Sequence, residues 1–155
     1  MSNVTIRTAS ADDAETVTAN NLALAQEAEG RRLDPDTVCS GVRRLLADPT
    51  RGVYYLAERD GKVVGQLLIT REWSDWRDGW FWWIQSVYVS PDARRQGVYR
   101  TLHQHVEAQA RHQPDVRGLR LYVDSGNTRA QRVYEQLGMK QSGYILYETD
   151  WSGQT

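Results

Sequence analysis

The sequence has very little cysteine, no long apolar run and no surplus of charge of either sign. Cys39 is the only cysteine among 155 residues, which excludes an internal disulfide and a cysteine-rich zinc site. No apolar run approaches the roughly 18–20 residues that span a bilayer, and residues 1–4 lack the basic-then-apolar layout of a signal peptide. We therefore expect a cytoplasmic protein that makes no contact with a membrane.

Nucleic acids and metals are also poor candidates as ligands. The 19 basic and 20 acidic residues leave a net charge of -1, whereas nucleic-acid binders usually carry a basic surplus. His103 and His105 lie two apart on a predicted helix and cannot face one site. No pattern of cysteine or carboxylate residues supports a metal at these histidines or at His112, so we expect no metal centre.

Length and periodicity indicate one domain over residues 1–155, with an α/β (α+β mixed sheet) fold. No linker or internal repeat interrupts the chain, and Asp60-Gly61 between two β-rich runs is a strong hairpin signal. The element order β-α-α-β-β-β-α-β-α-β predicts helices on both faces of a mixed sheet. The expected strands cover residues 4–8, 53–58, 62–70, 80–89, 119–123 and 144–148, with helices over 11–29, 35–47, 98–110 and 128–137.

The turn after Val89 is the segment most typical of a binding site. It carries Arg94 and Arg95, then Gly97, and a helix with Arg100 in its first turn. The first amides of a helix lack internal partners and lie at the positive end of its dipole, so they bind anions. Gly97 has no side chain to block an approaching phosphate, and the arginines can add charge-assisted bonds. The alternative is an exposed basic loop that needs a glycine for its turn.

Neither common nucleotide motif is present, which argues against ATP, GTP and NAD as the anion. Arg94-Arg95-Gln96-Gly97-Val98-Tyr99 matches the pattern Gln/Arg-x-x-Gly-x-Gly/Ala at Arg94 and Gly97, with Tyr99 replacing the last small residue. A second block from Asn127 matches Asn-x-x-Ala-x-x-x-Tyr-x-x-x-Gly-Phe, with Met139 replacing the phenylalanine. With these two blocks the chain resembles the GNAT superfamily of N-acetyltransferases over essentially its whole length.

This resemblance implies a central, splayed sheet and acetyl-CoA as cosubstrate. Asn127 would add a bond to the pantetheine arm or the diphosphate, although it also suits a plain helix cap. The bulk of Tyr99 requires its ring to point away from the diphosphate or to lie along it. The implied cosubstrate contacts are the amides of Gln96, Gly97, Val98, Tyr99 and Arg100 for the diphosphate and the backbone of Val87 and Val89 for the pantetheine arm.

The resemblance also implies that Tyr134 protonates the departing CoA thiolate, since a phenol is neutral at pH 7. Tyr134 also suits a place in the core. Many family members carry a glutamate base at the position of Gln85, and neither Gln85 nor its neighbour Ser86 can act as a base. The proton would leave through a water chain held by these residues, or through Glu72 or Asp124; an amine of low pKa would need no base.

The distribution of tryptophan gives a clue to the acceptor. Trp73 and Trp76 belong to a predicted loop, and Asp75 beside them could help to receive a cationic amine. A homodimer interface, a hydrophobic lid and simple core packing are alternatives. Five of the six tryptophans fall within eleven residues, namely Trp73, Trp76, Trp80, Trp82 and Trp83.

Together these observations predict a single-domain N-acetyltransferase that moves acetyl directly from acetyl-CoA to the primary amine of a small molecule. One alternative is a protein or peptide N-acetyltransferase, for which an open groove would replace a closed pocket. Another is a non-catalytic regulatory domain that binds acyl-CoA. The missing glutamate at Gln85 favours the regulatory domain, and Tyr134 favours the enzyme.

Overall fold

The structure, a computed structural model, describes residues 3–153. The chain forms two compact units, the first ending at Leu121 and the second beginning at Tyr122. No helix within the described residues combines the length and the apolar composition that crossing a membrane requires.

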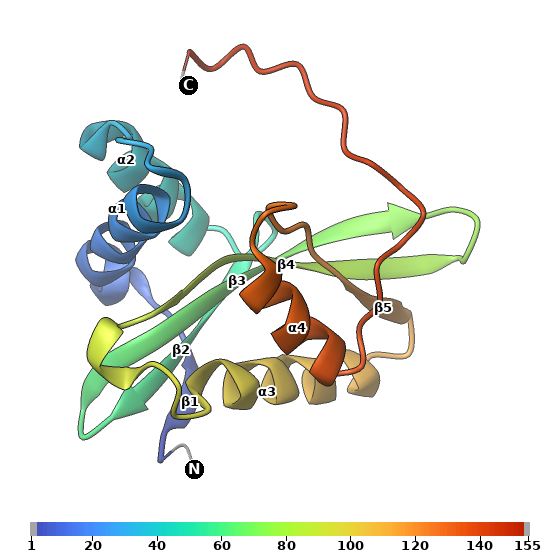
Figure 1. Ribbon diagram of the computed structural model, residues 1–155, viewed down its shortest axis with the longest axis horizontal. Coiled ribbons are helices and arrows are strands. Elements are labelled where there is room, and N and C mark those ends of the chain that lie inside the picture. The colour runs from blue at the N-terminus through green and yellow to red at the C-terminus, as the bar shows by residue number, and fades with distance from the viewer. Residues whose placement is uncertain (1–2, 154–155) are drawn as a thin grey trace. The chain divides into compact units, whose positions relative to one another are not determined.

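The first unit is built on a five-stranded sheet in the order β1-β2-β3-β4-β5 (Figure 1). Neighbouring strands are antiparallel except for β4 and β5, which are parallel. The strands are β1 (Thr5–Thr8), β2 (Val53–Arg59), β3 (Lys62–Ser74), β4 (Gly79–Val89) and β5 (Val116–Arg120), and the helical segments are η1 (Ala11–Asp13), α1 (Ala14–Glu29), α2 (Pro35–Leu46), η2 (Pro91–Ala93) and α3 (Val98–His112).

Side-chain alternation along β2 places a core on each face of the sheet. Tyr54 and Leu56 are buried against α1 and α2, whereas Tyr55 and Ala57 are buried against α3. Successive side chains of a strand point to opposite faces, so β2 supplies both cores. This arrangement confirms the mixed α/β sheet with helices on both faces.

Local signals in the sequence set several boundaries as predicted. Asp60 and Gly61 have φ of 53° and 74°, the left-handed values that a two-residue hairpin needs. Asp34 accepts a hydrogen bond from the amide of Thr37 at 3.0 Å and begins α2. Gly30, with φ of 62°, ends α1 in the left-handed conformation.

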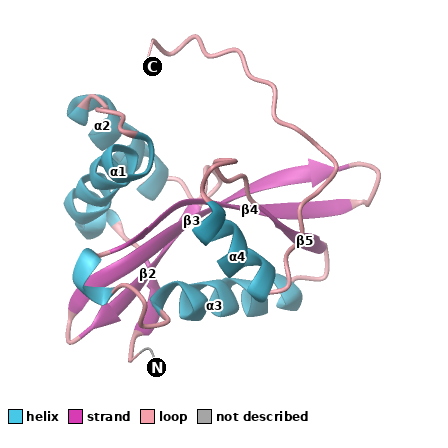
Figure 2. Ribbon diagram, viewed as in Figure 1, coloured by secondary structure: helices cyan, strands magenta, loops and turns pink. Residues whose placement is uncertain are grey.

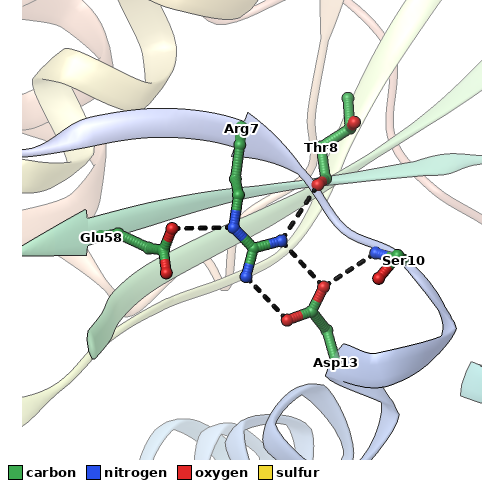
Figure 3. A network of polar contacts seen from close by, with 5 residues as sticks. All are labelled: Arg7, Thr8, Ser10, Asp13 and Glu58. Atoms are coloured by element: carbon green, nitrogen blue, oxygen red, sulfur yellow. Dashed lines mark hydrogen bonds and ion pairs between the residues drawn. The ribbon is translucent and has the colours of Figure 1, made fainter. Parts of the chain in front are cut away.

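An arginine joins β1 to β2 and to the segment that begins α1 (Figure 3). The Arg7 guanidinium donates to both oxygens of Asp13, at 2.8 and 2.9 Å, and its Nε donates to Glu58 at 2.8 Å. Asp13 also accepts from the amide of Ser10 at 2.8 Å. The bonds from Arg7 hold the pKa of Asp13 below its ordinary value, so this carboxylate is ionised at neutral pH.

The second unit contains α4 (Thr128–Gln136), which begins and ends near the predicted residues. The strand predicted over residues 144–148 is not formed, and the chain after α4 is drawn as a loop in Figure 2. A strand needs a partner for its backbone, and within residues 3–153 no strand pairs with this segment. Its large apolar side chains are exposed, at 70% for Tyr144, 77% for Ile145, 66% for Leu146 and 86% for Tyr147.

Candidate functional site

The turn between β4 and α3 presents backbone amides at the start of a helix. Arg95 and Gly97 have φ of 63° and 79°, which turns the chain sharply before Val98. Val98 is only 1% exposed and anchors the first turn of α3 in the core. The first intrahelical bond runs from the Thr101 amide to the Gly97 carbonyl at 3.0 Å. The amides of residues 98–100 therefore precede every intrahelical donor, which is the geometry that receives an anion.

Tyr99, the bulky residue in this turn, is directed along α3. Its hydroxyl lies 3.0 Å from Nδ1 of His103, one turn further into the helix, and the two rings are 5.6 Å apart. Residues four apart on a helix share a face. The phenol therefore points towards the carboxyl end of α3, away from the amides at its start, as the first of the two predicted orientations requires.

The polar side chains of the turn differ in what they contact. Arg95 and Arg100 are exposed, and the Gln96 amide donates to the Asp92 carbonyl at 3.1 Å. The Arg94 guanidinium instead bonds to Glu27 of α1 at 2.6 Å. The predicted contact of Arg94 with a diphosphate remains a prediction, and this side chain already has protein partners.

Strand β4 loses its neighbour in the sheet halfway along its length. It pairs with β5 only from Trp80 to Trp83, although it continues to Val89. The strand predicted over residues 119–123 accordingly ends at Arg120, where that pairing stops. On this side, the second half of β4 has no paired strand within residues 3–153. An extended ligand can bond to such a backbone as an added strand would, which fits a pantetheine arm at Val87 and Val89.

Strand β4 is irregular at Ser86, a short way beyond the end of its pairing with β5. The pairing with β3 shifts by one residue between Gln66 and Leu68, and Ser86 on the opposite strand has φ of 50°. The side chain of Gln66, which is 0% exposed, donates to the Ser86 carbonyl at 3.0 Å. It also bonds to Asn20 and Asn21 of α1 at 3.1 and 2.9 Å. A buried glutamine thus holds the bulge against α1.

Gln85 lies on the sheet face covered by α1 and α2, because it pairs with Leu68 of that core. Its amide donates to the Thr70 hydroxyl at 2.6 Å. The same alternation brings Trp83 and Glu72 to this face, and the Trp83 indole donates to Glu72 at 3.0 Å. A row of polar and aromatic side chains therefore extends from Gln85 along the paired strands β3 and β4 towards the turn that joins them.

Glu72 is a poor candidate for the base. It accepts hydrogen bonds from Trp83 at 3.0 Å and from Arg120 at 2.8 Å. Both bonds lower the pKa of its carboxyl, the Trp83 bond most. A carboxylate stabilised in its charged form is a weak proton acceptor. Glu72 is therefore better suited to attracting a cation than to removing its proton.

The residues predicted to contact the acetyl acceptor lie on the other face of strands β3 and β4 or in the turn that joins them. Trp73 pairs with Trp80, and their rings meet at 5.0 Å on the face opposite to Gln85. Asp75 and Trp76 belong to the turn at the tip, where Trp76 is 84% exposed. The loop expected from residue 73 to residue 80 is thus mostly strand. The pairing register of β3 and β4, which the sequence does not reveal, places Trp73 on the face opposite to Gln85. Trp83 lies on the same face as Gln85 and is therefore better placed than Trp73 to contact an acceptor there.

The second unit carries the remaining two predicted residues. Asn127 caps α4, and its side-chain oxygen accepts from the Ala130 amide at 3.2 Å. Tyr134 lies on the same helix, and burial raises the pKa of its hydroxyl. Tyr134 is therefore protonated at neutral pH and can serve as a proton donor.

A helix start that can receive a phosphate, beside a strand with an open edge, agrees with the comparison to known families. The model of the acetyltransferase (GNAT) family matches residues 19–139. The chain belongs to the GNAT family of acetyltransferases. The matched range includes the turn before α3 and all of α4.

Relatives of this GNAT chain include two curated enzymes. Phosphinothricin N-acetyltransferase of Alcaligenes faecalis is 37% identical over 94 residues, which cover 59% of this chain and 46% of that enzyme. Mycothiol acetyltransferase of Streptomyces griseus subsp. griseus is 33% identical over 154 residues, covering 95% and 47% respectively. The chain thus spans about half the length of these relatives.

Among solved structures, the chain is similar to one described as a possible acetyltransferase from Clostridium difficile 630. The TM-score is 0.89 and the identity 41%, and the match covers 95% of this chain and 97% of that chain. The fold of the GNAT chain is therefore that of solved members of this class.

Proposed function

We propose that the chain is an acetyl-CoA-dependent N-acetyltransferase that acts on the primary amine of a small molecule. The observation that carries this proposal is the helix start at Gly97, which follows β4 after a short turn. Within residues 3–153, the second half of β4 has no parallel neighbour. The names of the two curated relatives contain the small molecules phosphinothricin and mycothiol. Their names support a small acceptor here.

Acetyl-CoA would bind through the backbone at both parts of this site. The amides of residues 96–100 would hold the diphosphate, with Arg95 and Arg100 adding charge from exposed positions. The pantetheine arm would lie along Val87 and Val89 at the open side of β4. The orientation of Tyr99 towards His103 supports this assignment, because its ring leaves the helix start accessible.

In the proposed reaction the neutral amine nitrogen attacks the thioester carbonyl carbon. A carbon–nitrogen bond forms, the carbon–sulfur bond breaks, and CoA leaves after its sulfur takes a proton from Tyr134. Burial keeps the Tyr134 hydroxyl protonated until that step. Asn127 would bond the pantetheine arm or the diphosphate from the start of α4.

The amine also loses a proton, and neither Gln85 nor Ser86 can take it directly. We propose that a water held by Gln85 and Ser86 passes this proton to solvent. Gln85 has a defined orientation for that task because its amide is bonded to Thr70 at 2.6 Å. Arg120 at 2.8 Å already compensates the charge of Glu72. The Trp83 ring on the same face would favour an acceptor that arrives as a cation.

The release of CoA thiol from acetyl-CoA tests the proposal directly. Purified protein would be assayed with single primary amines, amino acids bearing a second charged group, and a lysine-rich peptide. We expect thiol release that depends on one small amine and forms its N-acetyl product. Turnover of the peptide alone would indicate a protein acetyltransferase. CoA binding without release for any acceptor would indicate a regulatory domain, and either result would contradict the proposal.

A further inference from the structure

We propose that Arg94 is a positioning residue which, with Glu27, fixes the end of β4 to helix α1. This inference rests on the proposed cosubstrate site, whose diphosphate Arg94 was predicted to contact. It gives the arginine a different task. Arg94 would set the geometry of the site through protein contacts alone and would not bind the phosphates.

Two hydrogen bonds hold the guanidinium between distant parts of the chain. Its Nη2 donates to Oε1 of Glu27 at 2.6 Å, and its Nε donates to the Val89 carbonyl at 2.9 Å. Glu27 belongs to the last part of α1, and Val89 is the last residue of β4. One side chain therefore links a helix, the end of a strand and the turn that follows it.

Tyr88 completes the cluster. Its hydroxyl donates to the second oxygen of Glu27 at 2.9 Å, and the Arg94 guanidinium lies over its ring at 5.5 Å. Tyr88 is 8% exposed, so its ring is fixed by packing. Each oxygen of Glu27 thus has a separate donor. Networks of this kind hold geometry better than an isolated surface pair.

The charges within the cluster support the same assignment. The Arg94 bond and then the Tyr88 bond lower the pKa of Glu27, so it is a carboxylate throughout the neutral range. A carboxylate at 2.6 Å compensates the arginine charge that a diphosphate would otherwise attract. Moving Arg94 to a phosphate would leave Glu27 without its cation and would break the bond from Arg94 Nε to the Val89 carbonyl.

The position of Val89 gives this cluster a functional consequence. The proposed pantetheine contacts end at Val89, and the proposed diphosphate amides begin a few residues later. Arg94 lies in the turn between these two sets of backbone groups. Fixing this turn to α1 keeps the proposed pantetheine contacts and the proposed diphosphate amides at the spacing that one extended ligand requires. An error of about 1 Å in such positioning can cost a hundredfold in rate.

The two roles predict opposite effects for the loss of Glu27. If Arg94 bound the diphosphate, Glu27 would compete with it, and Glu27→Gln would tighten binding of CoA. If Arg94 positions the turn, Glu27→Gln breaks the same link as Arg94→Gln and weakens binding. Arg94→Lys adds a second distinction, because lysine keeps the charge but cannot make both bonds from a planar fork.

Calorimetric titration with CoA, which needs no acceptor, measures these effects. We expect Arg94→Gln, Glu27→Gln and Arg94→Lys each to weaken binding by about tenfold, a change of about 1.4 kcal/mol. The double variant Glu27→Gln/Arg94→Gln should be no weaker than either single variant, because both remove one interaction. Glu29→Gln, an exposed change on the same helix, should bind CoA as the wild type does.

Tighter or unchanged binding by Glu27→Gln would overturn the inference, as would wild-type affinity in Arg94→Lys. Thermal unfolding of each variant shows whether the fold is retained, and a variant that does not fold is replaced by Tyr88→Phe, for which we expect a smaller loss of the same sign. Absence of CoA binding by the wild type would instead contradict the proposed function itself.

Discussion

At the scale of single residues, the proposed site depends on the direction in which the Tyr99 side chain is held. Tyr99 would obstruct the helix start if its ring turned towards it, and its bond to His103 directs it along α3. His103 is 1% exposed, and burial lowers the pKa of its imidazole. A neutral imidazole can accept the phenol proton at Nδ1. This pair explains how the turn tolerates a tyrosine where the family pattern has a small residue.

Tyr134 is the residue whose chemistry is most directly testable. Tyr134→Phe removes the proposed proton donor and keeps the ring, so turnover should fall by about a hundredfold. Affinity for CoA should stay within a few-fold of the wild type. Steady-state thiol release and calorimetry would measure the two quantities, with Tyr147→Phe, whose ring is 86% exposed, as the control that retains full turnover. Unchanged turnover in Tyr134→Phe would place the donor elsewhere.

At the scale of elements, β4 combines a long paired half with a second half that has an open side. The bulge at Ser86 lies within the open half, and Gln66 holds it by bonding to the Ser86 carbonyl and to α1. Bulges bend a strand and are frequent beside active sites. The buried network therefore fixes the course of the β4 backbone at the bulge.

Gln66→Leu should cost stability because it removes the hydrogen bonds that this buried side chain makes to Asn20 and Asn21 of α1 and to the Ser86 carbonyl of β4. We expect the free energy of unfolding to fall by about 2 kcal/mol, since each lost hydrogen bond costs roughly 0.5–1.5 kcal/mol. Urea denaturation would measure this change. Gln104→Leu, an exposed substitution on α3, is the matched control and should alter stability by less than about 0.5 kcal/mol. Equal losses in the two variants would contradict the role assigned to Gln66.

Local chemistry made most elements predictable from the sequence. Asp34 and Asn127 cap helices as their types predict, and Asp60-Gly61 forms the expected hairpin. The segment over residues 144–148 has the composition of a strand, yet pairing is a property of the whole sheet that composition does not determine. The bulge at Ser86 has no local signal, although a glutamine inside the apolar run of β3 marks a buried polar group.

At the scale of the whole molecule, the turn before α3 was easier to predict from the sequence than the residues that would contact the acceptor. The turn before α3 is contiguous in sequence, so its arginines and Gly97 could be considered together. Their spacing alone also allowed an exposed basic loop, and the resemblance to the GNAT pattern favoured a diphosphate site at Gly97. Which residues would contact the acceptor depends on the face of the sheet that each residue of β3 and β4 occupies. The pairing register of the two strands determines that face. Trp73 and Trp83 could not be distinguished by composition; the alternation of Trp83 with Gln85 was the available signal.

The partners of Arg94 were the least predictable part of the site. Glu27 is far from Arg94 in sequence and precedes it on a helix with no motif of its own. Only the packing of α1 against the end of β4 brings the two side chains together. Charge patterns along the chain therefore identified the arginine but not its contacts.

We propose that backbone amides at the start of α3 bind the CoA diphosphate. Calorimetric titration of CoA into Gly97→Glu measures this contact, with Gly61→Glu as the control. Both glycines have left-handed φ, 79° and 74°, so both substitutions carry a similar backbone strain of about 1–2 kcal/mol. We predict that Gly97→Glu abolishes CoA binding and that Gly61→Glu retains it. Equal affinity for CoA in the two variants would contradict the account.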